Sequence, residues 1–292
     1  MGFLRLMRPA NIVTSVADVL AGVAISGFLL SAGLVQGSLI SILFLCISTI
    51  GLYGGGVVFN DVFDAELDRL ERPERPIPKG IVTLREATVL GLVLLLLGII
   101  AAAIVSVLSG LLALAIAIAA LVYNKWSKHQ FIAGPLNMGL CRGLNLLLGM
   151  SILPAAVFSW WVLAFIPIIY IAAITMISRG EVHGGSRKVL YFAAFLYGLV
   201  IAVILFLSFT RGTVMWTVVF LVFFGWMIFS KLIKAIQNPL PQNISKAVKA
   251  GVIALVLMNA AWAAAFGVLY LAFFIVLLLP LSLWLAKKFA VT

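Results

Sequence analysis

The chain has 292 residues, of which 64% are hydrophobic and only 10% are charged, and its mean hydropathy is +1.25. A soluble protein of this length needs far more polar surface, so the composition excludes a soluble globular fold and predicts a polytopic membrane protein. Twenty basic residues against nine acidic ones give a net charge of +11. Because no basic amphipathic face or aromatic RNA-binding motif accompanies this excess, we assign it to the flanks of membrane helices and expect no nucleic acid as a partner.

Long apolar runs follow one another along the whole chain and predict a single all-α domain, residues 1–292, of nine or ten transmembrane helices. A run of about 20 apolar residues is long enough to cross a bilayer as a helix. The runs lie at 12–34, 38–59, 87–106, 108–123, 132–153, 159–178, 190–209, 213–230, 247–267 and 268–286. The last two are nearly continuous, with Gly267 as the expected break, which leaves the count between nine and ten.

The basic residues predict how these helices cross the membrane. With a cytoplasmic N-terminus and ten spans, 18 of the 20 basic residues fall on the cytoplasmic side, Arg211 lies outside and Arg142 lies within a span. Basic residues gather on the cytoplasmic side of membrane proteins. We therefore expect a multi-pass protein of the plasma or inner membrane with a cytoplasmic N-terminus. The loops at 60–86 and 179–189 then face the same side, and membrane lipid surrounds the bundle.

Acidic residues are concentrated in one segment, because seven of the nine lie between Asp61 and Glu86. Asp61, Asp64 and Asp68 have the spacing i, i+3, i+7, which places their carboxylates on one face of a helix. Carboxylates about 6 Å apart repel by roughly 2–3 kcal/mol at an effective dielectric of about 20. A divalent metal ion is the natural group to offset that repulsion.

Basic residues follow the carboxylates directly: Arg72, Arg75 and Lys79. This order suits a metal-bridged diphosphate, in which Asp and Asn oxygens hold Mg²⁺ and the basic side chains neutralise the remaining charge. The alternative is a solvated interfacial loop with ordinary salt bridges. The scarcity of acidic residues elsewhere, and three on one face at a membrane boundary, favour a binding site.

Polar residues inside the fifth apolar run form a second group of candidates: Asn137, Arg142 and Asn145. A charged side chain at membrane depth costs about 2.5–3.5 kcal/mol on insertion scales, so Arg142 needs an interior partner, for which Asp18 is the candidate. Asn137 and Arg142 are candidates for lining a cavity that holds diphosphate or acceptor. The alternative is a structural hydrogen bond to another helix.

The acidic segment resembles the first aspartate-rich motif of the UbiA superfamily of intramembrane prenyltransferases. That motif reads N-D-x-x-D-x-x-x-D followed by R-x-x-R-P-[IL]-P-x-G, and residues 60–80 match it. The N-terminal L-x-R-P-x-N, with Arg8 and Asn11, is similar to the first helix of that family. The segment from Tyr123 to Lys128 is similar to its Tyr-x-x-x-x-Lys element. The resemblance covers the whole chain and implies a UbiA-like bundle.

The resemblance also implies an activity: transfer of a prenyl group from a Mg²⁺-bound prenyl diphosphate to an aromatic or other lipophilic small acceptor. The implied metal ligands are Asn60, Asp61, Asp64 and Asp68. Catalytic roles are implied for Asp64, Asp68 and Lys128. Substrate contacts are implied for Asn11, Arg72, Arg75, Lys79 and Tyr123.

A second aspartate-rich motif of that family is depleted here. Residues 178–188 read S-R-G-E-V-H-G-G-S-R-K, so that Glu181 is the only acid and His183 is the only other plausible metal ligand. A loop hydrogen-bonding role is favoured over metal ligation for His183. This stretch most resembles the EboC-type branch, and we expect a second metal ion to bind there weakly or not at all. The depletion keeps an alternative open: a non-catalytic UbiA-like protein that binds or moves a lipophilic precursor.

Overall fold

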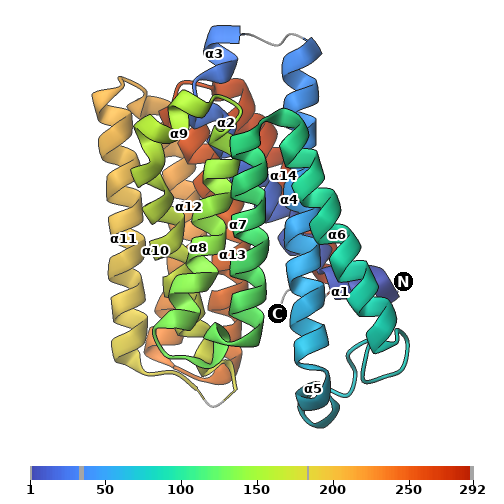
Figure 1. Cartoon of the computed structure of the whole chain (residues 1–292). Coiled ribbons are helices and arrows are strands. Elements are labelled where there is room, and N and C mark those ends of the chain that lie inside the picture. The colour runs from blue at the N-terminus through green and yellow to red at the C-terminus, as the bar shows by residue number, and fades with distance from the viewer. Residues whose placement is uncertain (1, 33–35, 183, 290–292) are drawn as a thin grey trace.

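The structure is a computed structural model that describes residues 2–32, 36–182 and 184–289. Every regular element among these residues is a helix (Figure 1). In chain order the elements are α1 (Gly2–Met7), α2 (Pro9–Ile25), α3 (Phe28–Ala32), α4 (Gln36–Phe63), α5 (Ala65–Glu71), α6 (Leu84–Val105), α7 (Val107–Lys125), η1 (Ser127–His129), α8 (Ala133–Met150), α9 (Pro154–Trp160), η2 (Trp161–Ala164), α10 (Phe165–Ser178), η3 (Arg179–Glu181), α11 (Arg187–Thr210), α12 (Val214–Gln237), α13 (Pro241–Ala265) and α14 (Leu269–Lys288).

Each apolar run of the sequence contains a helix of this bundle, although the helix ends differ from the run ends. Eight helical stretches among the described residues are long and apolar enough to cross a membrane. The shorter α2 and α8, with 17 and 18 residues, pack among them. The expected all-α, multi-pass membrane bundle is therefore confirmed. Its last two helices are separate, and the break falls at Gly267, whose φ of 81° is a conformation that glycine adopts readily.

The run at 12–34 forms a shorter helix than its length suggests. α2 ends at Ile25, and the Ser26 hydroxyl donates to the carbonyl of Val23 at 2.7 Å while accepting from the backbone N–H of Phe28 at 3.2 Å. Gly27 follows with φ of 74°. A glycine in this left-handed conformation is a common helix terminator, so apolar composition alone overestimates the length of the first helix.

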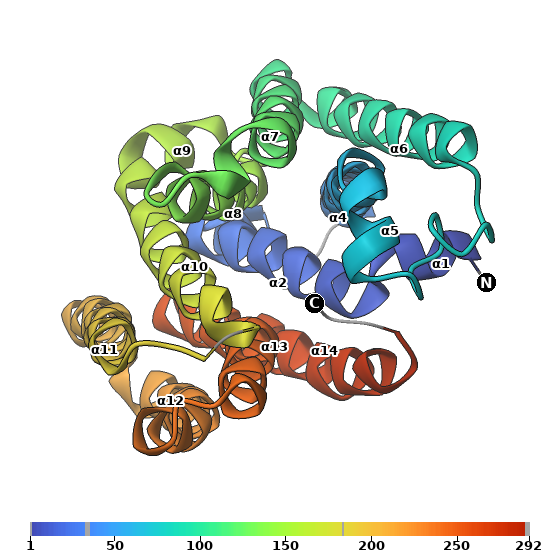
Figure 2. The same ribbon diagram turned by 90° about the horizontal axis from the view of Figure 1, so that it is seen from below.

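α2 occupies the centre of the bundle, where it contacts α4, α8, α13 and α14 (Figure 2). Nearly all of its residues are buried. α13 is also largely buried, whereas α6, α11 and α14 turn most of their surface outward. The outward surfaces are apolar, as expected for helices whose outer faces contact lipid.

Successive membrane helices run in alternating directions, so the connections after α4, α7, α10 and α12 lie at the same end (Figure 1). Arg72 and Glu181, from the loops at 60–86 and 179–189, line the same cavities. The expectation that these loops meet on one side of the bundle is confirmed. The assignment of that side to the cytoplasm stays a prediction from the basic residues.

Two glycines bring α2 and α8 to backbone contact. A Cβ atom added at Gly149 would lie 2.1 Å from the carbonyl oxygen of Val19, and one added at Gly22 would lie 2.3 Å from that of Leu146. Small residues at such crossings let membrane helices approach closely. This approach matters for the site because α2 carries Asp18 and α8 carries Arg142.

We expect Gly149→Ala to lower the free energy of unfolding by about 1–3 kcal/mol or more, because the new methyl group overlaps a neighbouring backbone. The matched control is Gly198→Ala in α11, where nothing lies within 4 Å of the added Cβ. There the change should be neutral or stabilising by about 0.5–1 kcal/mol, since alanine favours helix. Denaturation of the purified proteins in detergent measures both, and equal stabilities would contradict the close crossing.

The two ends of α11 offer a test of orientation. In a chain without Cys46 and Cys141, an impermeant thiol reagent added to intact cells should label Thr210→Cys and leave Ser186→Cys unlabelled, because the basic residues place position 186 in the cytoplasm. Both positions are exposed and flank the same helix. The opposite labelling pattern would invert the predicted topology.

Candidate functional site

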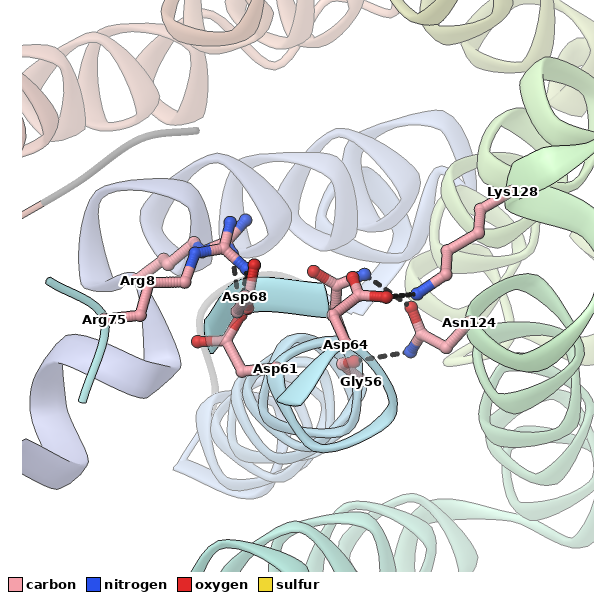
Figure 3. A network of polar contacts seen from close by, with 9 residues as sticks. Arg8, Gly56, Asp61, Asp64, Asp68, Arg75, Asn124 and Lys128 are labelled. Carbon is pink, nitrogen blue, oxygen red and sulfur yellow. Dashed lines mark hydrogen bonds and ion pairs between the residues drawn. The ribbon is translucent and has the colours of Figure 1, made fainter. Parts of the chain in front are cut away.

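The acidic segment lies where α4 passes into α5, and Asp64 interrupts the helix there. Asp64 has φ of −91° and ψ of 1°, outside the helical range. Backbone hydrogen bonds from Asp64 to Asn60 and from Asp68 to Asp64 hold the junction together. The expectation of one continuous helical face with three carboxylates is therefore wrong. Asp61 and Asp68 turn to one side, and Asp64 turns to the other (Figure 3).

Two arginines from distant parts of the chain hold the first pair of carboxylates. Arg8 Nη2 donates to Asp61 Oδ1 at 2.9 Å, and Arg75 Nη1 donates to the same oxygen at 3.2 Å. Arg75 Nη1 also donates to Asp68 Oδ2 at 2.6 Å. Both carboxylates are buried, where a charge without a partner would be strongly destabilising. These ion pairs hold Asp61 and Asp68 together, whereas Asp64 pairs with Lys128.

Arg8 reaches Asp61 from a strained position. It lies between α1 and α2 with φ of 47°, the one positive φ outside glycine among the described residues. A non-glycine residue adopts this conformation only where its surroundings hold it. Pro9 then begins α2 with a ring geometry suited to the first helical position.

The turn after α7 holds the third carboxylate. Lys128 Nζ donates to Asp64 Oδ1. Asn60 Nδ2 donates to Asn124 Oδ1 at 3.2 Å. Asn124 Nδ2 donates to the carbonyl of Gly56 at 2.7 Å (Figure 3). Asn124 thereby fixes the last turns of α4 against α7 and orients the Asn60 amide.

A cavity of about 410 Å³, called here the first cavity, extends from these side chains into the bundle. Most of the predicted site residues line it: Asn11, Asn60, Asp64, Asp68, Arg72, Arg75, Tyr123, Arg142 and Glu181. Lys128 joins the site through Asp64. Asp61 instead lines a second cavity nearby. Lys79 is exposed, Asn137 contacts Ser127 Oγ at 3.0 Å, and neither lines either cavity.

A buried ion pair closes the inner end of the first cavity. Arg142 Nη1 donates to Asp18 Oδ2 at 2.7 Å and Nη2 donates to Thr14 Oγ1 at 2.8 Å. Asn259 Nδ2 donates to Asp18 Oδ1 at 2.7 Å, and Asn145 Nδ2 donates to Asp18 Oδ2 at 3.2 Å. Asp18 is thus confirmed as the partner of Arg142. Pairing and hydrogen bonds compensate a charge that would otherwise be costly at this depth.

Several residues of the site were not predicted from the sequence. Tyr53 stacks on Arg142, with the guanidinium carbon 4.8 Å from the ring centroid, and Thr49 Oγ1 donates to Asn145 Oδ1 at 2.8 Å. Both line the first cavity, as does Asn124. Asn124 had a usable signal, because it directly follows Tyr123 in a motif already identified. Tyr53 and Thr49 lie in an apolar run and carried none.

The donor atoms facing the first cavity fit Mg²⁺. Asn60, Asp64 and Asp68 present hard oxygen ligands, which this ion prefers. No cluster of three or more His, Cys, Asp or Glu side chains suited to a metal forms among the described residues. Phosphate oxygens and water would therefore supply much of the coordination, as is common for Mg²⁺ bound with a substrate.

Glu181 ends η3 and lines both cavities. Its Oε1 atom is buried and has no hydrogen-bond partner among the described residues. His183, the other candidate of this stretch, lies outside the described residues. Glu181 therefore contributes a lone carboxylate on the side of the first cavity opposite α4.

Comparison with known proteins places this geometry in a family. The model of the UbiA prenyltransferase family matches residues 19–243. A digeranylgeranylglyceryl phosphate synthase of Ignicoccus hospitalis is 32% identical over 187 residues, which cover 62% of this chain and 57% of that protein. The synthase of the same name from Metallosphaera sedula is 33% identical over 187 residues, covering 62% and 61%. The chain thus spans about 60% of the length of these relatives.

Solved structures share the fold. A UbiA homologue from Aeropyrum pernix K1 aligns with a TM-score of 0.69 at 16% identity, covering 86% of this chain and 96% of that one. A UbiA homologue from Archaeoglobus fulgidus, bound to DMAPP and Mg²⁺, aligns with a TM-score of 0.65 at 17% identity, covering 92% and 100%. These two curated relatives carry the name digeranylgeranylglyceryl phosphate synthase, and assignment to the EboC-type branch stays a prediction.

Breaking the buried ion pair between Asp18 and Arg142 tests how much it contributes to the free energy of unfolding. We expect Asp18→Asn to lower the free energy of unfolding by about 3–5 kcal/mol, because Arg142 keeps a buried charge without a counter-ion. The double variant Asp18→Asn with Arg142→Met should recover most of that loss, since no unpaired charge remains. Unfolding in detergent of both single variants and the double variant gives the coupling energy. Additive losses would argue against the pair.

Proposed function

Because the chain belongs to the UbiA prenyltransferase family, we propose that it transfers a prenyl group from a prenyl diphosphate to a lipophilic acceptor within the membrane. The observation that carries this proposal is the first cavity. Its polar end presents Asn60, Asp64 and Asp68 beside Arg72 and Arg75, and the cavity then continues between apolar side chains of the bundle. A diphosphate with an apolar tail matches both parts.

The cationic side chains would bind the leaving group. Arg72 and Arg75 both line the first cavity, and the Arg75 guanidinium, which donates to Asp68, can engage phosphate oxygens as well. Lys128 holds Asp64 toward the cavity. As the bond between C1 of the prenyl chain and the diphosphate oxygen breaks, the diphosphate leaves with the electron pair. Positive charge placed beforehand around that oxygen favours its departure.

Asn60, Asp64 and Asp68 are the residues that would hold Mg²⁺. When bound, the ion acts as a Lewis acid on the diphosphate. Asp61 has a different part in this proposal, since its carboxylate accepts from Arg8 and Arg75 and lines the second cavity. It positions Arg75. Glu181 is a single carboxylate, and a hard divalent ion usually needs several anionic oxygens, so we retain the expectation of a weak second metal site.

The sequence and the relatives point to different classes of acceptor. The sequence suggests an aromatic or other lipophilic small molecule, whereas the relatives are named for a glyceryl phosphate that carries prenyl groups. We extend that class to this chain and propose an acceptor of glycerophosphate type, whose hydroxyl oxygen bonds to C1 of the prenyl chain and loses its proton to the departing diphosphate. Asn11, Tyr123 and the Arg142 group line the first cavity where the two substrates would meet.

A second candidate function is binding or movement of a lipophilic precursor without chemistry. The lone carboxylate in the stretch 178–188 favours it, because the family motif there is depleted. Mg²⁺-dependent release of diphosphate by the purified protein separates the two functions. A protein that only binds or moves the precursor would bind the prenyl diphosphate without releasing diphosphate from it.

We expect Asp64→Asn and Asp68→Asn each to lower Mg²⁺-dependent diphosphate release by about 10²–10³-fold, because each removes an anionic oxygen from the metal-binding end of the cavity. Asp61→Asn should act through the position of Arg75 and cost about 10–100-fold. Turnover of a labelled prenyl diphosphate by purified variants measures all three.

The matched control is Glu66→Gln in the same segment. Glu66 is exposed, pairs only with Arg69 at the surface and lines neither cavity. It should keep wild-type turnover. If Asp64→Asn and Asp68→Asn turned over substrate as fast as this control, the proposed metal site would be wrong.

A further inference from the structure

A second cavity, also of about 410 Å³, lies against the first at the polar end of the bundle. The two share Arg8, Arg72, Arg75 and Glu181. The remaining walls come from α1, the loop after α5, the start of α13 and the end of α14. Figure 2 shows α1, α5 and α14 gathered on this side of the molecule. The second cavity is therefore built by segments far apart in the sequence.

The second cavity has more positive than negative charge. Five cationic side chains line it against three carboxylates. Arg8 and Arg75 already pair with Asp61. The other cations, Arg5, Arg72 and Lys288, make no ion pair with any described residue. Arg72 is attracted to the nearby Glu181 carboxylate, whereas Arg5 and Lys288 have no such partner among the described residues, and an anionic ligand would supply one.

The carboxylates of the second cavity do not cancel this excess. Asp61 Oδ1 already accepts hydrogen bonds from two guanidinium groups. Glu74 is exposed to solvent. Glu181 faces both cavities with an unpartnered oxygen, which can accept a hydrogen bond from a ligand hydroxyl at their boundary. The side chains thus suit a ligand that carries an anion and a hydroxyl group.

The flanks of the second cavity are apolar. Phe3 and Leu4 on α1 are exposed, and so is Trp284 on α14, whose ring lies 4.2 Å from Lys288 Nζ. At a membrane boundary such residues contact acyl or prenyl chains. Guanidinium and ammonium groups beside them form a setting for a phosphate monoester whose tail lies in lipid.

We propose that the second cavity binds the phosphate group of the prenyl acceptor through Arg5 and Lys288, with the acceptor hydroxyl directed to Glu181. This inference rests on the proposed function, which supplies the prenyl acceptor, and deepens it by locating the phosphate group of that acceptor. It makes the substrate class a phosphorylated alcohol with an apolar tail. The donor diphosphate occupies the first cavity, so the two anions are held apart by the ion pairs of Asp61.

The test compares binding of dodecylglycerol phosphate and of dodecylglycerol to the full-length protein in neutral detergent by isothermal titration. Neither prenyl diphosphate nor Mg²⁺ is present, so the result does not depend on transfer. The wild-type protein should bind the phosphate compound about tenfold or more tightly than the alcohol. The double variant Arg5→Gln with Lys288→Gln should lose that preference.

The matched control is Arg85→Gln with Lys287→Gln. It removes the same charge from the same end of the bundle, and Lys287 neighbours Lys288, but neither residue lines either cavity. This control should keep the preference for phosphate. Equal loss in both double variants would assign the effect to general surface charge and overturn the proposal, as would an undiminished preference in Arg5→Gln with Lys288→Gln. Thermal unfolding of each variant verifies that it is folded.

Membrane lipids also carry phosphate groups. A competition experiment distinguishes a site for a lipid headgroup from a site for the acceptor. Phosphatidylglycerol at equal concentration should fail to displace dodecylglycerol phosphate, since its phosphate is a diester with one negative charge. Equal displacement would overturn the proposal in favour of a lipid headgroup site. Failure of the proposed function is distinct, because it shows as absent diphosphate release in the separate assay, whatever the binding preference.

Discussion

Compensation of buried carboxylates at the membrane boundary is the constraint on which the site depends. Asp61 and Asp68 are buried, and charges in such positions persist only when they are paired and hydrogen-bonded. Arg75 bridges both of them, and Arg8 supplies the second guanidinium to Asp61. This pairing ties the N-terminal helix to the loop after α5. It also leaves Asp64 free to turn to the other side, where Lys128 holds it.

The same principle operates at the inner end of the first cavity. Arg142 and Asp18 neutralise each other, and amide and hydroxyl groups from α2, α8 and α13 complete their hydrogen bonds. The close crossing of α2 and α8, which depends on Gly22 and Gly149, brings the two charged side chains together. The first cavity therefore has polar side chains at both ends and apolar side chains between them. The apolar stretch suits a prenyl chain, and the end with Asp64 and Asp68 suits its diphosphate.

Asp61 and Glu181 illustrate how a motif residue can differ in role from its neighbours. Asp61 belongs to the same short motif as Asp64 and Asp68, yet it faces the second cavity. Glu181 stands alone where the family pattern has several carboxylates, and it borders both cavities. Under the proposed function, the first supports the leaving-group site and the second contacts the acceptor. The depletion of the second motif is then compatible with transfer chemistry.

The sequence by itself determined the helical membrane bundle and the motif of residues 60–80, because apolar length and residue spacing are local properties. It also identified Asp18 as the partner of Arg142, since a charge at membrane depth requires an opposite one. Only the tertiary structure decided that the helix breaks at Asp64, that Asn124 and Tyr53 belong to the site, and that Lys79 and Asn137 do not line it. Those outcomes depend on which cations and amides distant segments bring within reach of each carboxylate, and no local pattern encodes that distance. The second cavity is the clearest case, because Arg5 and Lys288 stand at opposite ends of the chain and meet only in the folded protein.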